Sequence, residues 1–101
     1  MYEKFFMERL TSLRQQKNVS AREMSLAIGQ NDSYINRIEN GKTFPSMQVF
    51  FYICEYLNVT PQEFWDPMNK SPQIMDEILE SLKKFNVAQL DAFLNLINKV
   101  N

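Results

Sequence analysis

Apolar residues recur at intervals of three and four along most of the chain, which is the pattern of helices with one buried face. The first such stripe predicts a helix over residues 3–17 and consists of Tyr2, Phe6, Leu10 and Leu13. The other faces of this helix carry charged side chains. Apart from Arg14, we expect these charges to lie on a solvated surface: Glu3, Lys4, Glu8 and Arg9.

Two short helices joined by a tight turn are predicted within residues 19–41. Ser20 and Glu23 have the spacing of a capping box, in which each side chain accepts from a backbone N–H that the first helical turn leaves unsatisfied. A helix should therefore begin at Ala21. Gly29 stands at its end, where a residue tolerant of positive φ is needed.

A second helix is predicted over about residues 32–39. Asn31 is suited to cap its start, and Asn40-Gly41 is a helix-ending signal. In the first of the two helices Ser25 is small, so the pair can cross closely. Caps and spacing together predict a helix-turn-helix.

A very apolar helix is predicted over residues 47–57, capped by Ser46. Nine of its eleven residues are apolar, although a surface helix needs only one apolar stripe. We therefore expect its second stripe to be covered, either by the C-terminal segment or by a second subunit. That stripe consists of Val49, Tyr52 and Tyr56.

A short fifth helix follows. Thr60 and Glu63 form another capping box, with Pro61 at the first helical position. The composition of residues 67–70 is that of a linker, so residues 1–66 should form one domain.

Residues 71–101 are predicted to form two amphipathic helices joined by a tight turn, an αα-hairpin. Asn86 and Gln89 form the capping box of the second helix. Such a hairpin cannot bury both apolar stripes alone, so it must lie on the helix 47–57 or pair with a second copy. The stripes are Ile74, Ile78, Leu82 and Phe85, then Val87, Leu90, Phe93, Leu94, Ile97 and Val100.

Residues 9–66 resemble the helix-turn-helix regulators of the phage repressor and Cro type, the XRE family. The motifs that carry the resemblance are Leu13-Arg14, Tyr34-Ile35, Arg37-Ile38-Glu39-Asn40-Gly41-Lys42, Pro45-Ser46 and Val59-Thr60-Pro61. The resemblance implies an all-α fold, with a five-helix bundle like that of lambda repressor ahead of the hairpin. It implies an ion pair between Arg14 and Glu39 that fixes the first helix against the recognition helix. It also implies inward positions at Met47, Phe50, Ile53, Cys54 and Leu57.

The resemblance further implies that the second helix of the motif enters the major groove of double-stranded DNA. The implied base contacts are Asp32, Ser33, Asn36 and Arg37. Arginine can engage guanine O6 and N7 together, and asparagine can face adenine. The alternatives are a surface salt bridge for Arg37 and a solvated helical position for Asn36. The implied phosphate contacts are Arg22, Tyr34, Asn40 and Lys42.

Two positions depart from the family pattern. Asp32 stands where the family often has a neutral polar residue. Its carboxylate can accept from cytosine N4 but repels phosphates, and its alternative role is a favourable interaction with the helix N-terminus. Ala21 stands where the family commonly has a glutamine that reaches the DNA backbone. Both departures weaken the case for tight DNA binding.

The charge of the chain is unevenly distributed. The net charge is −1, which does not favour a polyanionic partner. Residues 1–45 carry seven Lys or Arg against five Asp or Glu, whereas residues 46–101 carry four against seven. The half with the helix-turn-helix is thus the basic one.

Residue types exclude most catalytic chemistry. The chain has one cysteine, Cys54, and no histidine, so an internal disulfide, a zinc site or a Cys–His nucleophile lacks its residues. We expect no cofactor, no metal, no small-molecule ligand and no enzymatic activity. No apolar run approaches the roughly 18 residues of a membrane span, and no leader pattern opens the chain, so we expect a cytoplasmic protein.

The sequence therefore predicts a sequence-specific, DNA-binding transcriptional repressor that acts as a homodimer. The alternative is a protein–protein interaction module that uses the helix-turn-helix as a scaffold and binds DNA weakly or not at all. Low basicity, Ala21 and Asp32 favour the alternative, and a fold alone does not establish a function.

Overall fold

The computed structural model describes residues 1–100, without the side chain of Val100. In this range the chain forms seven helices and no strand, which confirms the all-α class. Asn101 and the Val100 side chain, both predicted to belong to the hairpin, lie outside the described part. The helices are α1 (Tyr2–Lys17), α2 (Ala21–Ala27), α3 (Tyr34–Glu39), α4 (Met47–Leu57), α5 (Pro61–Phe64), α6 (Pro72–Leu82) and α7 (Val87–Val100).

Local capping signals determine where several of these helices begin. Ser20 Oγ accepts from the Glu23 N–H at 2.9 Å, and the Glu23 carboxylate accepts from the Ser20 N–H at 3.5 Å. The boxes that begin at Thr60 and at Asn86 are formed as well. Because each box satisfies N–H groups that have no intrahelical acceptor, α2, α5 and α7 begin where the sequence predicts.

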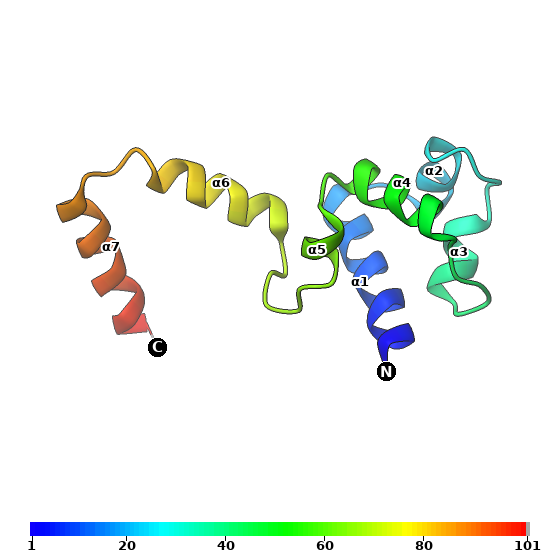
Figure 1. Cartoon of the computed structure of the whole chain (residues 1–101), viewed down its shortest axis with the longest axis horizontal. Helices are drawn as coiled ribbons and strands as arrows, with labels where there is room; N and C mark the ends of the chain where they lie inside the picture. Colours follow the sequence, from blue (N-terminus) through cyan, green and yellow to red (C-terminus); the bar gives the residue numbers. More distant parts are fainter. Residues whose placement is uncertain (101) are drawn as a thin grey trace.

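Helices α1 to α5 pack around one core (Figure 1). α1 contacts α3 and α4, and α2 lies against α3. Burying a large apolar side chain contributes roughly 1.5–3 kcal/mol, so this core holds the two helices of the helix-turn-helix on α1. Its centre consists of side chains that are 0% exposed: Leu10, Met24, Ile35, Ile38, Ile53 and Phe64.

Aromatic side chains fill the base of the bundle around Phe6. Its ring centroid lies 5.0 Å from that of Phe64 and 5.6 Å from that of Trp65. An open hollow of about 280 Å³ remains beside them, between α1 and the start of α4. Tyr2 and Met47 line this hollow and are 69% and 67% exposed. Their predicted inward positions are wrong, because each lies in the first turn of its helix, where the hollow stays open.

Arg9 is buried, so its prediction as a solvated surface charge is wrong. Its side chain is tied to backbone carbonyls: Nε donates to Phe64 at 2.8 Å, and Nη2 donates to Glu63 and to Asn69, each at 2.7 Å. A longer contact of 3.5 Å joins Nη1 to the Lys70 carbonyl. Burial lowers the pKa of Arg9, although an arginine in a protein remains protonated. Arg9 therefore holds the end of α5 and the segment after it against α1.

Helix α6 leaves this body and α7 turns away from α6, which makes the molecule elongated, with extents of 52 × 26 × 22 Å (Figure 1). The hairpin predicted here is open, because α6 and α7 do not lie along one another. Nor do they cover the second stripe of α4 within residues 1–100. Val49 and Tyr56 pack against the core instead, and Tyr52 is 40% exposed. Most of the apolar side chains of α6 and α7 therefore stay exposed.

Candidate nucleic-acid interface

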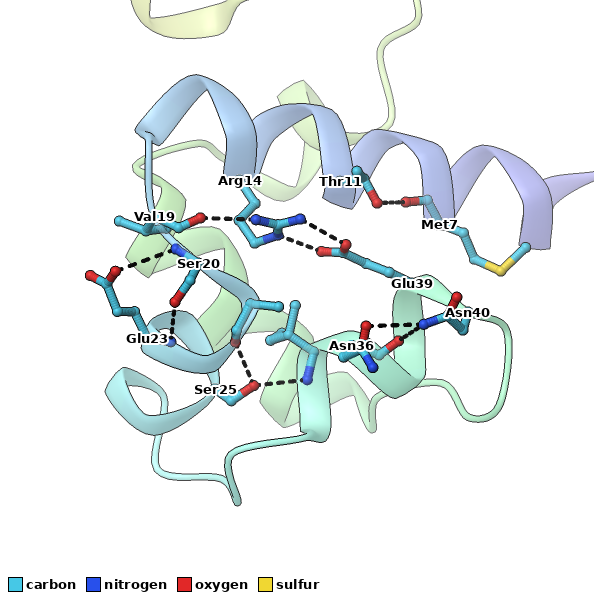
Figure 2. Close-up of polar contacts among 12 residues, drawn as sticks. Met7, Thr11, Arg14, Val19, Ser20, Glu23, Ser25, Asn36, Glu39 and Asn40 are labelled. Atoms are coloured by element: carbon cyan, nitrogen blue, oxygen red, sulfur yellow. Dashed lines mark hydrogen bonds and ion pairs between the residues drawn. The ribbon is translucent and has the colours of Figure 1, made fainter.

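The buried hydroxyl of Ser25 joins the two helices of the helix-turn-helix, as Figure 2 shows. Ser25 is 0% exposed, and its Oγ donates to the Ala21 carbonyl at 2.7 Å and accepts from the Ile35 N–H at 2.9 Å. The Ile35 N–H lies in the first turn of α3 and lacks an intrahelical acceptor. Ser33, directly before α3, makes no side-chain cap bond. Ser25 of α2 therefore supplies the cap of α3. The small size of Ser25, noted in the sequence, did not reveal this role.

α3 begins at Tyr34, two residues later than predicted. Asn31 does accept from a backbone N–H, but the bond closes a turn: its Oδ1 accepts from the Ser33 N–H at 3.2 Å and from the Ser33 hydroxyl at 3.1 Å. The predicted boundary is wrong because an asparagine makes the same bond in a turn as in a helix cap. Asp32 and Ser33 consequently lie in the turn ahead of α3.

α3 ends in a Schellman motif, which fixes the chain directly after the helix. Gly41 has a φ of 73°, its N–H donates to the Ile38 carbonyl at 3.0 Å, and the Lys42 N–H donates to the Arg37 carbonyl at 2.9 Å. A Cβ at Gly41 would lie 3.1 Å from Met7 Sδ. Both the backbone angle and the close approach of α1 thus favour glycine.

The pair of Arg14 and Glu39 joins α1 to the end of α3 (Figure 2). Arg14 Nε lies 2.7 Å from one carboxylate oxygen of Glu39 and Nη2 lies 3.0 Å from the other, while Nη1 donates to the Val19 carbonyl at 2.9 Å. The two side chains are only 15% and 11% exposed. The hydrogen bond to Glu39 raises the pKa of Arg14. A bidentate, charge-assisted pair restricts geometry strongly, so it sets the orientation of α3 on α1.

α3 presents one exposed polar face. Asn36 and Arg37 within α3, and Ser33 and Asn40 directly before and after it, follow one another at intervals of three, one and three residues. They therefore share one side of the helix, and all four are exposed. The apolar residues of α3 point into the core on the opposite side. The sequence-predicted base contacts on the helix are thus brought together in solvent.

The remaining candidates flank this face. Asp32 precedes α3 and Lys42 follows it, and both are exposed, as is Arg22 on α2. Tyr34 differs, because it is half-buried against the core and burial raises the pKa of its hydroxyl. Tyr34 is therefore less accessible to a ligand than the other candidates.

On this surface, two pairs of candidate residues contact each other. Arg22 Nε lies 3.7 Å from Asp32 Oδ2. Asn40 Nδ2 donates to the Asn36 side-chain oxygen at 3.0 Å and to the Asn36 carbonyl at 2.7 Å (Figure 2). Recognition of adenine uses both the oxygen and the nitrogen of an asparagine amide. The bond from Asn40 orients the Asn36 side-chain oxygen and leaves it a second lone pair for a base.

Cys54 lies away from this surface, in the core. It is 2% exposed, and burial, with a smaller effect of Glu55, raises the pKa of its thiol to about 11. The thiol is therefore protonated and unreactive at neutral pH. Within residues 1–100, no three His, Cys, Asp or Glu side chains are grouped as a metal site would require. In the same range, every helix is too short or too polar to span a bilayer.

The compact five-helix body, with its anchored and exposed α3, defines a DNA-binding helix-turn-helix protein. A sequence profile of the family described as Helix-turn-helix matches residues 10–64, more than half of the chain. The match extends from α1 to the end of α5 and includes the Arg14–Glu39 pair. The chain therefore belongs to this family of DNA-binding transcription regulators, the XRE and Cro type. No curated protein and no solved structure matches it.

Proposed function

We propose that this protein is a sequence-specific repressor that binds double-stranded DNA as a homodimer, with α3 in the major groove. The observation that supports the proposal most directly is the exposed polar face of an anchored α3. Ser25 holds the start of this helix, Glu39 pairs with Arg14 near its end, and the turn at Gly41 closes it. A helix fixed in this way loses little conformational freedom when it binds, which favours affinity.

The chemistry of each position suggests its role on DNA. Arg37 contacts guanine, a bidentate contact that discriminates against the wrong base by about 1–3 kcal/mol. Asp32, Ser33 and Asn36 are the other positions that face base edges. Contacts to phosphates position the protein without reading sequence. We assign them to Arg22, Tyr34, Asn40 and Lys42.

A homodimer would place two copies of α3 in successive major grooves, about 34–36 Å apart on the duplex. Such a protein recognises inverted half-sites, because the symmetry of the site mirrors that of the dimer. Repression follows when the occupied site overlaps the region that the transcription machinery needs. The similarity to phage repressors supports this direction of regulation.

Selection from a randomised duplex pool at two salt concentrations tests the proposal. We expect enrichment of one inverted-repeat sequence and a steep loss of affinity at the higher salt concentration, because counterions are released from each neutralised phosphate. Feeble retention of all duplexes alike, at both salt concentrations, would reject DNA recognition. A reporter with the selected site upstream then distinguishes repression from activation.

A double substitution, Arg37→Ala with Lys42→Ala, tests the surface itself. We expect it to lower affinity for the selected site by about 30-fold or more, since one base contact and one phosphate contact are lost. The matched control is Lys4→Ala with Lys99→Ala, which removes the same charge from exposed positions on α1 and α7. It should change affinity only slightly. Equal losses in both variants would show that total charge, not this face, governs binding.

The second candidate function is a protein interaction module with no role for DNA. The ion pair of Arg22 with Asp32 favours it, because it occupies a cation on the surface in question, as does the net charge of −1. Under this alternative the pool yields no selected sequence. The Arg37→Ala and Lys42→Ala variant would then still capture its partner protein.

A further inference from the structure

The apolar faces of α6 and α7 have no cover within the described chain. Ten large apolar side chains on these helices and the turn between them are at least 40% exposed. Helices of 11 and 14 residues are marginal in water unless they pack against something. The exposed set includes Ile74, Ile78, Phe85, Leu90, Leu94 and Ile97.

The open angle between the two helices leaves an apolar groove. Its volume is about 360 Å³, and its walls include Ile78, Leu82 and Phe85 on one side and Phe93 of α7 on the other, together with the polar residues Glu77 and Ser81 of α6. A groove of this kind accepts large apolar side chains. Residues of the same kind project from α6 and α7 themselves, so a second copy of this chain carries the side chains that fit.

We propose that a second copy of this chain packs its own α6 and α7 against these faces, with the two α6 helices antiparallel, to form a four-helix bundle. This inference deepens the proposed homodimer and rests on it. Two-fold symmetry lets the side chains of each copy fill the groove of the other. Four short amphipathic helices then share one core, as in helix bundles.

The charges of α6 favour antiparallel pairing. Asp76 and Glu77 lie in the middle of α6, Glu80 lies near its end and accepts from Lys83 at 2.8 Å, and Lys83 and Lys84 follow the helix. An antiparallel pair that crosses near residue 80 brings Asp76 and Glu77 of one helix beside Lys83 and Lys84 of the other, whereas a parallel pair places like charges together. A charge pattern of this kind selects orientation more than it adds affinity.

The available area is that of a stable dimer. Specific interfaces bury roughly 800 Å² on each partner. Ten large apolar side chains, each about half exposed, provide apolar surface on that order. Tyr52 and its neighbours on α4 provide less, because Val49 and Tyr56 already pack against the core. The C-terminal helices are therefore the better site for a second copy.

The start of α6 is fixed to the five-helix body, so the orientation of α6 relative to that body is defined. Pro72, at the first position of α6, is among the fully buried residues. Gln16 Nε2 of α1 donates to the Lys70 carbonyl at 2.9 Å, and Arg9 holds the carbonyl of Asn69 at 2.7 Å. A bundle formed by α6 and α7 thus positions two DNA-binding bodies relative to each other.

Sedimentation velocity of the full chain in the absence of DNA tests the proposal, so its result does not depend on DNA recognition. We expect a dimer at micromolar concentration and a dissociation constant at least 100-fold higher for Ile78→Glu with Leu90→Glu. The control is Gln73→Glu with Asn95→Glu, which adds the same charge at exposed polar positions and should leave the dimer intact. The fluorescence of Trp65 reports whether the body of each variant remains folded.

Charge reversal tests the orientation. Asp76→Lys with Glu77→Lys, and separately Lys83→Glu with Lys84→Glu, should each weaken the dimer by about 3- to 10-fold. A mixture of these two variants should restore a heterodimer of native affinity. A monomeric native chain would overturn the proposal. So would a dimer that survives Ile78→Glu with Leu90→Glu, which would indicate α4 as the interface, or a mixture that fails to restore pairing.

Discussion

Arg22 and Asp32 face each other across the helix-turn-helix, with 3.7 Å between Nε and Oδ2. Their side chains are 69% and 60% exposed, so the pair contributes only about 0–1 kcal/mol to folding stability. Under the proposed function, its larger effect falls on DNA binding. The carboxylate partly neutralises a cation that we assign to a phosphate, and it adds a negative charge beside α3.

Asp32→Asn is therefore expected to strengthen DNA binding. The substituted amide can still accept from a base edge, while the loss of the negative charge frees Arg22 for a phosphate and abolishes a repulsion, so affinity for the selected duplex should rise by about 3- to 10-fold. The slope of log affinity against log salt concentration should become steeper by about 1, the change expected for one additional phosphate contact. Fluorescence anisotropy titrations at several salt concentrations measure both quantities.

Asp91→Asn is the matched control for that substitution. It removes the same charge from an exposed position on α7, so it reports the effect of net charge alone. If Asp32→Asn and Asp91→Asn change affinity equally, the Arg22–Asp32 pair has no specific role.

Ser25→Ala should destabilise the fold and loosen the start of α3. The Ile35 N–H loses its acceptor in a buried site, and an unsatisfied buried donor costs about 1–3 kcal/mol. Urea unfolding followed by circular dichroism gives the free energy of unfolding. Ser12→Ala, on the exposed side of α1, should be nearly neutral. A loss no greater than that of Ser12→Ala would show that water satisfies the Ile35 N–H.

Arg14 and Glu39 should show strong energetic coupling. Removing one member leaves the other charge largely buried, at a cost approaching 3–5 kcal/mol. The double variant Arg14→Met with Glu39→Leu should be less destabilised than the two single variants added together, because it leaves no unpaired charge. A double-mutant cycle by urea unfolding measures this difference, and additive effects would contradict the coupling.

Arg9→Met should destabilise the body and release the base of α6. The carbonyls of Phe64, Glu63 and Asn69 lose their donor together, and hydrogen bonds to a charged group contribute about 1.5–3 kcal/mol each. We expect a loss of several kcal/mol in unfolding free energy and faster amide exchange at the start of α6. Lys4→Met, an exposed residue of the same helix, is the control. Unchanged exchange there would mean that Pro72 and Gln16 hold α6 without Arg9.

Cys54 should resist alkylation in the folded protein. Its pKa is raised from 9.0 to about 11, so the reactive thiolate is scarce at pH 8. Because the folded state favours the protonated thiol, its contribution to stability is present below pH 9 and is lost as pH rises from 9 to about 11. Iodoacetamide labelling should be much slower than in the urea-unfolded chain. Equal rates would show that the thiol is accessible.

Local signals in the sequence account for most of the secondary structure. The boxes at Ser20, Thr60 and Asn86 link residues three apart, so the sequence alone contains both partners. Asn31 shows the limit of such signals, since its bond to the Ser33 N–H suits a turn and a helix start equally well. For this reason the sequence predicted α3 itself but placed its start too early.

The long-range hydrogen bonds from Arg9 to backbone carbonyls were not predicted, for a different reason. The acceptors of Arg9 lie 54 to 61 positions along the chain, and they are carbonyls, which every residue has. Nothing in their side chains signals an arginine partner. The Arg14–Glu39 pair joins residues 25 apart, and it was anticipated because both partners are charged side chains at positions that the family pattern relates. The placement of α6 and α7 depends on contacts that local periodicity does not specify.

The guanidinium of Arg9 lies where the C-terminal helices leave the body and holds carbonyls on both sides of that junction. Bending the chain there would strip a cation of its acceptors in a site that water scarcely reaches. Large excursions of α7 should therefore originate further out, at the exposed residues 83–86 between the two C-terminal helices. In the proposed dimer, α6 would keep a fixed direction relative to the body, while α7 changes its orientation about residues 83–86.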